Sequence, residues 1–236
     1  MNHPFEIVQD VVIKAEPEQI WKAVTEDTAA WMFPTDQWPA VRTVDEYPTH
    51  TVSRMEGPDG WYNQLEHVLT PGPDGTYLHY VHSGVLTDDW EQQYDGASKH
   101  TVFYLHTLGE YLTHFGGRAV AFSEVRGPDA SESAGAFQAF LTYLGLADAA
   151  IGEERELDLP GMGSVPVAVD FRNENFLGLR TPNALIRVFG RNAFGDRVGL
   201  TVHDFSADGA GEPERATLGE ANSVAWTQWL AEAFAG

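Results

Sequence analysis

The stretch Asp88–Phe115, DDWEQQYDGASKHTVFYLHTLGEYLTHF, decides the fold of this chain. At 100° per residue its apolar side chains fall on one face, which is typical of an amphipathic helix packed on a core. That face carries Trp90, Tyr94, Ala97, Thr101, Tyr104, Leu105, Leu108, Tyr111, Leu112 and Phe115. About 28 residues span roughly 40 Å at 1.5 Å per residue, so the helix needs a broad partner. We therefore expect a sheet that curves around this helix.

The residues before this helix have the pattern of a sheet with one helical insertion. The expected elements are a strand at 5–14, a helix that begins at Pro17, a second short helix at 27–33, and strands at 49–55, 61–69 and 76–83. Proline is favoured in the first turn of a helix, which sets the start of the first insertion helix. Clusters of proline, glycine and aspartate at 56–60 and 71–75 separate the last three strands and indicate hairpins. Consecutive hairpins predict an antiparallel sheet.

The order of elements starts again after Gly116 and Gly117, which are typical of a helix end. The expected elements are a strand at 119–125, a helix at 133–146, strands at 154–159, 165–171, 176–180, 184–189 and 197–205, a loop at 206–215, and a final helix. Each half of the 236 residues thus reads as strand, helix, several strands and long helix. The prediction is an α+β chain of two tandem domains, residues 1–117 and 118–236, with the boundary near Gly116–Arg118.

Composition excludes several classes of function. The net charge is −21, from 35 acidic and 14 basic residues, whereas nucleic acids and anionic membranes attract a Lys/Arg surface. The chain has no cysteine, so disulfides, thiolate nucleophiles and cysteine-bound metals are excluded. The N-terminal residues do not have the pattern of a signal peptide, and no apolar run reaches the ~20 residues of a membrane-spanning helix. We expect a cytoplasmic protein that binds no nucleic acid and does not insert into a membrane.

Several short motifs in the first half are shared with a known superfamily. They are AEPEQIWKAV at 15–24, Tyr47-Pro48 before the strand with Arg54, GTYL at 75–78 leading to VHSG at 81–84, and Trp90 at the start of the long helix. Together they make residues 4–115 resemble the SRPBCC (START-like, Bet v 1-like) superfamily, in the branch similar to the C-terminal domain of the Hsp90 ATPase activator. The second half resembles a divergent copy by its order of elements.

This resemblance implies a helix-grip fold, in which a curved antiparallel sheet wraps around a long C-terminal helix and leaves a cavity between them. Members of the superfamily bind lipids, steroids, polyketides or other apolar molecules. Some are cyclases or hydrolases, and others are co-chaperones. The branch supplies no shared catalytic triad to carry over to residues of this chain.

Strand alternation places polar side chains on the face expected to line the cavity. His67 shares a face with Trp61, Asn63 and Leu65, and His82 shares a face with Tyr80. A polar group inside an apolar cavity needs a hydrogen-bond partner, which a ligand can supply, although a core or surface partner satisfies it equally well. The predicted ligand-binding residues are Trp61, Asn63, Leu65, His67, Tyr80, His82, Tyr104 and Leu108.

Three functions follow from these patterns. The first is binding of a small hydrophobic or amphipathic molecule, lipid-, polyketide- or aromatic-like, between the sheet and the long helix. The second is a co-chaperone-like or regulatory module that binds a protein partner. The third is a cofactor-free cyclase or hydrolase with a cavity histidine as its base. No cofactor or metal is expected, because His106, Glu110 and His114, although spaced for one side of a helix, lie opposite its apolar face.

Overall fold

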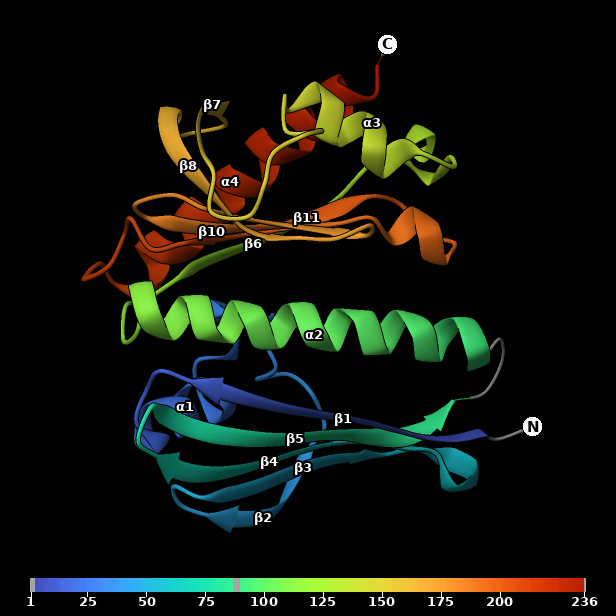
Figure 1. Cartoon of the computed structure of the whole chain (residues 1–236), viewed down its shortest axis with the longest axis vertical. Helices are drawn as coiled ribbons and strands as arrows, with labels where there is room; N and C mark the ends of the chain where they lie inside the picture. The colour runs from blue at the N-terminus through green and yellow to red at the C-terminus, as the bar shows by residue number, and fades with distance from the viewer. Residues whose placement is uncertain (1–2, 87–89, 236) are drawn as a thin grey trace. The chain divides into compact units, whose positions relative to one another are not determined.

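The computed structural model describes residues 3–86 and 90–235. The chain divides into two compact units, Met1–Gly117 and Arg118–Gly236. Each unit is an α+β helix-grip fold with one antiparallel sheet and a long helix at its C-terminal end (Figure 1).

In the first unit, α2 lies across one face of a five-stranded sheet (Figure 1). Its elements are β1 (His3–Ile13), α1 (Pro17–Thr25), the 3₁₀ turn η1 (Thr28–Ala30), β2 (Val41–Glu46), β3 (His50–Glu56), the 3₁₀ turn η2 (Pro58–Gly60), β4 (Tyr62–Gly72), β5 (Gly75–Leu86) and α2 (Trp90–His114). The strand order is β1-β5-β4-β3-β2, and all neighbouring strands are antiparallel. The first strand therefore pairs with the last, and the remaining strands follow as hairpins.

The apolar face of α2 is confirmed from Thr101 onward but is wrong at its start. Leu105, Leu108 and Tyr111 are buried, whereas Trp90 and Tyr94 are 39% and 37% exposed. These two side chains cover the edge strand β1. The Trp90 ring stacks on His3 at 5.1 Å between centroids, and the Tyr94 hydroxyl donates to the Glu6 carbonyl at 3.4 Å. Because β1 is an edge strand, it covers only one side of each aromatic ring, and the other side stays exposed. The predicted first residues of the helix, Asp88 and Asp89, lie outside the described residues.

Two local predictions in the first unit need correction. The expected helix at 27–33 is only the 3₁₀ turn Thr28–Ala30, followed by an irregular segment up to β2. Strand β2 was not predicted at all. It is an edge strand whose residues are nearly all exposed, so it has no apolar alternation to reveal it. The predicted insertion helix is present as α1, where the Glu16 N–H donates to Gln19 Oε1 at 2.9 Å in a capping box.

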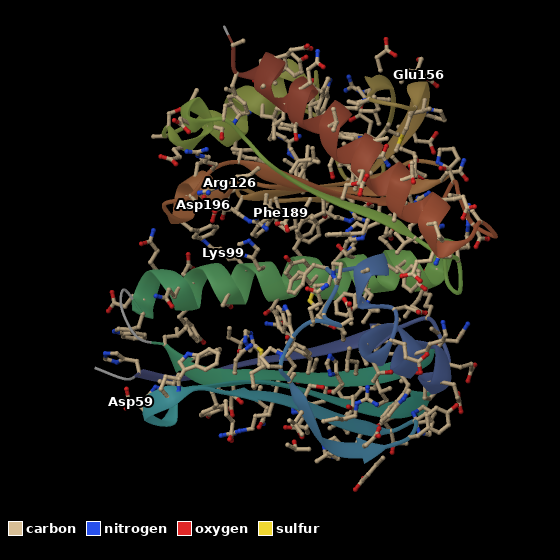
Figure 2. The ribbon with its side chains drawn as sticks, turned by 180° about the vertical axis from the view of Figure 1, so that it is seen from behind. Asp59, Lys99, Arg126, Glu156, Phe189 and Asp196 are labelled. Atoms are coloured by element: carbon tan, nitrogen blue, oxygen red, sulfur yellow. The ribbon has the colours of Figure 1, made fainter. Side chains whose placement is uncertain are left out.

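The second unit repeats the connection pattern of the first with one more strand. Its elements are β6 (Ala121–Arg126), the 3₁₀ turn η3 (Asp129–Glu132), α3 (Ala136–Tyr143), β7 (Glu154–Leu159), β8 (Gly163–Arg172), β9 (Phe176–Arg180), β10 (Ala184–Phe189), the 3₁₀ turn η4 (Arg191–Phe194), β11 (Gly199–Asp204) and α4 (Glu212–Ala233). The strand order is β6-β11-β10-β9-β8-β7. An ion pair between Arg126, at the end of β6, and Asp196, just before β11, ties two neighbouring strands together (Figure 2).

Helices α3 and α4 differ from the predicted ranges, and both help to enclose one apolar core. Helix α3 is shorter than the predicted 133–146, and α4 begins inside the predicted loop at 206–215 because Pro213 occupies its first turn. Phe140 on α3 and Trp226 and Leu230 on α4 are fully buried. They pack with side chains of the sheet, among them Leu177, Ile186, Val188, Leu200 and Val202. These side chains belong to one apolar cluster of buried residues.

Candidate functional site

A cavity of about 300 Å³ lies inside the first unit, between the sheet, α2 and the segment that follows α1. The sheet contributes Arg42, Ser53, Leu65, His67 and Tyr80, and α2 contributes Thr101, Tyr104 and Leu105. The remaining lining residues are Val24, Thr25, Thr28, Trp31, Met32, Thr35, Asp36, Trp38 and Ala40. About half of these side chains are apolar or aromatic and the rest are polar, so the cavity suits a small molecule that has both apolar and polar parts.

The floor of the cavity comes from two adjacent rows of cross-strand partners. In one row His67 on β4 is opposite Tyr80 on β5. In the other, Arg42 on β2 is opposite Ser53 on β3, and Ser53 is opposite Leu65 on β4. Cross-strand partners point to the same face of a sheet, so these five side chains share the inner face. The cavity therefore runs from the middle of the sheet to its edge strand.

The inner end of the cavity is formed by His67, Tyr80 and Thr101. Their exposed fractions are 5%, 8% and 5%. The rings of His67 and Tyr80 meet edge to face, with centroids 5.1 Å apart. Burial lowers the pKa of His67 to about 4, because the imidazolium ion would lose its water. Burial also raises the pKa of Tyr80, partly opposed by a hydrogen bond with Thr101. At neutral pH both side chains are uncharged.

His67 lacks an internal hydrogen-bond partner within the described part of the chain. The rings of His67 and Tyr80 meet edge to face, and burial is the cause of the lowered pKa of His67. A neutral imidazole has one donor and one acceptor nitrogen. Because the side chain lines the cavity, a molecule inside it can reach these nitrogens.

The mouth of the cavity lies at the edge strand, where the lining residues become exposed. Asp36, Ala40 and Arg42 are all exposed. Arg42 Nη1 pairs with Asp45 Oδ1 at 3.3 Å, and Nη2 donates to the Thr25 carbonyl at 3.5 Å. The guanidinium thus links β2 to the end of α1 beside the opening.

Aromatic side chains of the segment between η1 and β2 cover the cavity. The rings of Phe33 and Trp38 are 5.1 Å apart, and Phe33 meets Tyr104 on α2 edge to face at 5.9 Å. The indole N–H of Trp31 donates to the Ala23 carbonyl at 2.9 Å, which holds its ring in place. Sequence reasoning missed Trp31, Met32 and Trp38 as lining residues. The signal available was the density of aromatics in WMFPTDQWPA, residues 31–40, which has no helical or strand period.

Four of the eight predicted site residues line the cavity, namely Leu65, His67, Tyr80 and Tyr104. The other four do not. Asn63 and His82 contact each other, with His82 Nε2 2.6 Å from Asn63 Oδ1, and Phe5 meets the His82 ring edge to face at 4.9 Å.

Trp61 and Leu108 are the remaining two predicted residues outside the cavity lining. Trp61 precedes β4, and its ring lies so close to Gly57 that a Cβ there would be 2.9 Å from it. Leu108 is a residue of α2 and is fully buried in the core. A side chain on the inner face of the sheet or of the helix therefore does not necessarily line the cavity. Of the two histidines considered as bases, only His67 lines the space that a bound molecule would occupy.

Three further predictions concern metal binding, membrane insertion and a protein partner. On α2, His114 Nε2 is 3.6 Å from Glu110 Oε2, and the described residues contain no group of three or more potential metal ligands. Within the same residues, no helix is both long and apolar enough to cross a membrane. For the protein-partner alternative, the outer face of β1 and β5 exposes Val8, Val12 and Tyr77. That alternative stays a prediction.

Comparison with known proteins gives matches to solved structures only. Neither the family models nor the curated proteins contain a match to this chain. A protein from Mesorhizobium loti, MLL2253, is 19% identical with a TM-score of 0.40, over 47% of this chain and 98% of that one. The Aha1 dimer from Colwellia psychrerythraea is 17% identical with a TM-score of 0.37, over 46% and 96%. DynU16, from the dynemicin biosynthetic locus, is 16% identical with a TM-score of 0.32, over 95% and 96%. At these values the matches say nothing about ligand or activity.

Proposed function

We propose that the first unit binds a small, largely apolar molecule between its sheet and α2. The observation that carries this proposal is the cavity of about 300 Å³, whose walls combine aromatic and aliphatic side chains with several polar groups. Ligand sites usually span roughly 300–1,000 Å³, so the cavity suits a compact molecule rather than a long lipid. Its mouth at the edge strand β2 supplies a route of entry.

The expected affinity is modest. An aromatic ligand that buries about 200 Å² of apolar surface gains about 5 kcal/mol from the hydrophobic effect. Part of this gain is offset by the loss of translational and rotational freedom, whereas contacts with preformed aromatic walls add to it. The balance corresponds to dissociation constants between about 1 µM and 1 mM. Binding should therefore be measured by titration, in addition to a search for a copurified ligand.

The test combines native mass spectrometry with titration. Freshly purified full-length protein is compared under native and denaturing conditions, and the fluorescent compound 2-naphthol is titrated into it at pH 7. We expect saturable binding of 2-naphthol, with a copurified small mass that is lost on denaturation if a natural ligand is retained. The matched control is Ser53→Phe, which places a ring in the cavity from β3 and should remove the binding. A bare chain mass together with no saturable binding, or equal binding by Ser53→Phe, would refute the proposal.

A further inference from the structure

We propose that the inner end of the cavity selects an uncharged hydrogen-bonding group, so that the ligand is a neutral, planar molecule of one or two rings with a hydroxyl or carbonyl group. This inference rests on the proposed function of the first unit. It assigns His67 as the side chain that recognises the polar group, and it orients the ligand with this group toward the middle of the sheet.

The distribution of charge along the cavity is the first observation behind this inference. Of the lining residues, Asp36 and Arg42 carry charge at neutral pH, and both are exposed at the mouth. Arg42 is on β2, two strands away from His67 on β4. Neighbouring strands are about 4.8 Å apart, so this separation is on the order of 10 Å. An ionised group at the inner end would lose its water and gain no counter-ion, which is strongly unfavourable.

The second observation is which polar lining groups are already satisfied within the protein. The Trp31 N–H donates to the Ala23 carbonyl at 2.9 Å. The hydroxyls of Thr28 and Thr35 are hydrogen-bonded to each other at 3.0 Å, and the Thr25 hydroxyl donates to a helix carbonyl at 2.7 Å. The hydrogen-bonding capacity of these groups is thus at least partly used within the protein.

His67 is different from these groups, because its imidazole has no internal hydrogen bond within the described residues. Burial keeps the ring neutral at pH 7, with one donor and one acceptor nitrogen. A hydroxyl can pair with either nitrogen and a carbonyl with the donor, whereas a carboxylate obtains no ion pair from an uncharged ring. The hydroxyl of Ser53, half-buried on β3, lies nearer the mouth and is open to a second polar group.

The third observation is the shape and chemistry of the walls. Trp31 and Trp38 come from the segment after α1, Tyr104 comes from α2, and Tyr80 comes from the sheet. Aromatic walls favour stacked or edge-to-face contacts with another ring, which add to simple burial. The volume of about 300 Å³ restricts the ligand to one or two such rings.

The experiment compares three compounds of similar shape at pH 7 on the full chain. They are naphthalene, which has no polar group, 2-naphthol, which is neutral, and 2-naphthoate, which is an anion. A net hydrogen bond of about 0.5–1.5 kcal/mol predicts that 2-naphthol binds about 3- to 10-fold more tightly than naphthalene. We expect 2-naphthoate to bind at least about 10-fold more weakly than 2-naphthol, because its charge is desolvated without a partner.

Two variants test whether His67 is responsible for the preference for 2-naphthol. His67→Leu should reduce 2-naphthol binding to the level of naphthalene and leave naphthalene binding unchanged or tighter. His67→Gln keeps a donor and an acceptor and should keep most of the preference. Circular dichroism and thermal melting establish that each variant is folded. If His67→Leu does not fold, the relative affinities of the three compounds for the wild-type protein and His67→Gln decide the question.

The outcomes separate this inference from the function on which it rests. If none of the three compounds binds, the proposed ligand-binding function fails. Equal affinities for the three compounds, or tightest binding of 2-naphthoate, would overturn the inference while the cavity remains a binding site. An undiminished preference for 2-naphthol in His67→Leu would overturn the assignment to His67.

Discussion

The two units share a topology but differ in what occupies the space under the long helix. In both, the first strand pairs with the last strand and the others follow as hairpins. The inner face of the first sheet carries Ser53, His67 and Tyr80 around a cavity, whereas Val188 and Val202 of the second sheet belong to a large cluster of buried apolar side chains. The fold alone therefore does not specify a binding site. The side chains on the inner face of the sheet are one factor that decides whether a cavity is present.

The position of the helix also contributes to this difference. In the second unit a Cβ at Gly219 of α4 would lie 2.8 Å from the Phe122 carbonyl of β6, so the helix backbone approaches the strand closely. The Ser123 hydroxyl donates to the Gly219 carbonyl at 2.8 Å, and Asn222 donates to Asp204 at 2.9 Å. These contacts hold the helix against its sheet. In the first unit, by contrast, Thr101 and Tyr104 of α2 stand over a space between helix and sheet.

The largest expected effect is the truncation of a core side chain in the second unit. Phe140→Ala should lower the free energy of unfolding by about 3–5 kcal/mol, because it opens a cavity among well-packed neighbours. Leu65→Ala in the first unit should cost no more than about 1–2 kcal/mol, because Leu65 already borders empty space. Calorimetry of both variants of the full chain measures the difference. Equal losses would show that the cavity is not an open space in solution.

Much of the fold was predictable from local pattern. The bounds predicted for β7, β9 and β10 agree with the structure, because turns bracket short apolar or alternating runs there. Strand β2 was missed because an exposed edge strand is held by backbone pairing with β3 and has no apolar face of its own. The pairing of a strand with its neighbour depends on residues that are distant in the sequence. The periodicity within one segment therefore cannot predict it.

The candidate site was predictable only in part, for a related reason. Alternation correctly placed Leu65 and His67 on the inner face, but it does not define where along the strands the cavity ends. Asn63 and His82 lie further along the same face, where they pair with each other and contact Phe5. Trp38 enters the cavity from an irregular segment that has no period to interpret.

The second prediction concerns acid, which should destabilise the first unit through its buried histidines. Burial lowers the pKa of His67 and of His82 from 6.5 to about 4. Between these values the unfolded chain binds protons that the folded unit does not, so stability is complete above pH 6.5 and falls as pH decreases toward 4. For the nearly fully buried His67, the loss is on the order of 3 kcal/mol. Both of these histidines lie in the first unit, so we expect this loss of stability there.

Hydrogen exchange at pH 7 and pH 4.5, corrected for the intrinsic exchange rates, measures the loss of stability in acid for each unit separately. Carboxylate protonation also weakens folded proteins in acid, so the decisive comparison is between wild type and His67→Leu. The variant should lose less protection of β4 and β5 on acidification than the wild type does. An identical loss in both would mean that His67 is not held neutral by burial in solution.

The smallest expected effect on stability comes from adding the same ring to each interior. Val202→Phe in the buried apolar cluster of the second unit should cost about 1–3 kcal/mol, because the extra atoms force neighbouring side chains out of their preferred rotamers. Ser53→Phe in the first unit should change the free energy of unfolding by less than about 0.5 kcal/mol, because the ring enters existing space and gains apolar contacts there. Thermal unfolding of both variants, together with 2-naphthol titration, completes the comparison. A large loss for Ser53→Phe would mean that the first interior is as closely packed as the second, and the difference between the two units would then lie in the chemistry of their side chains alone.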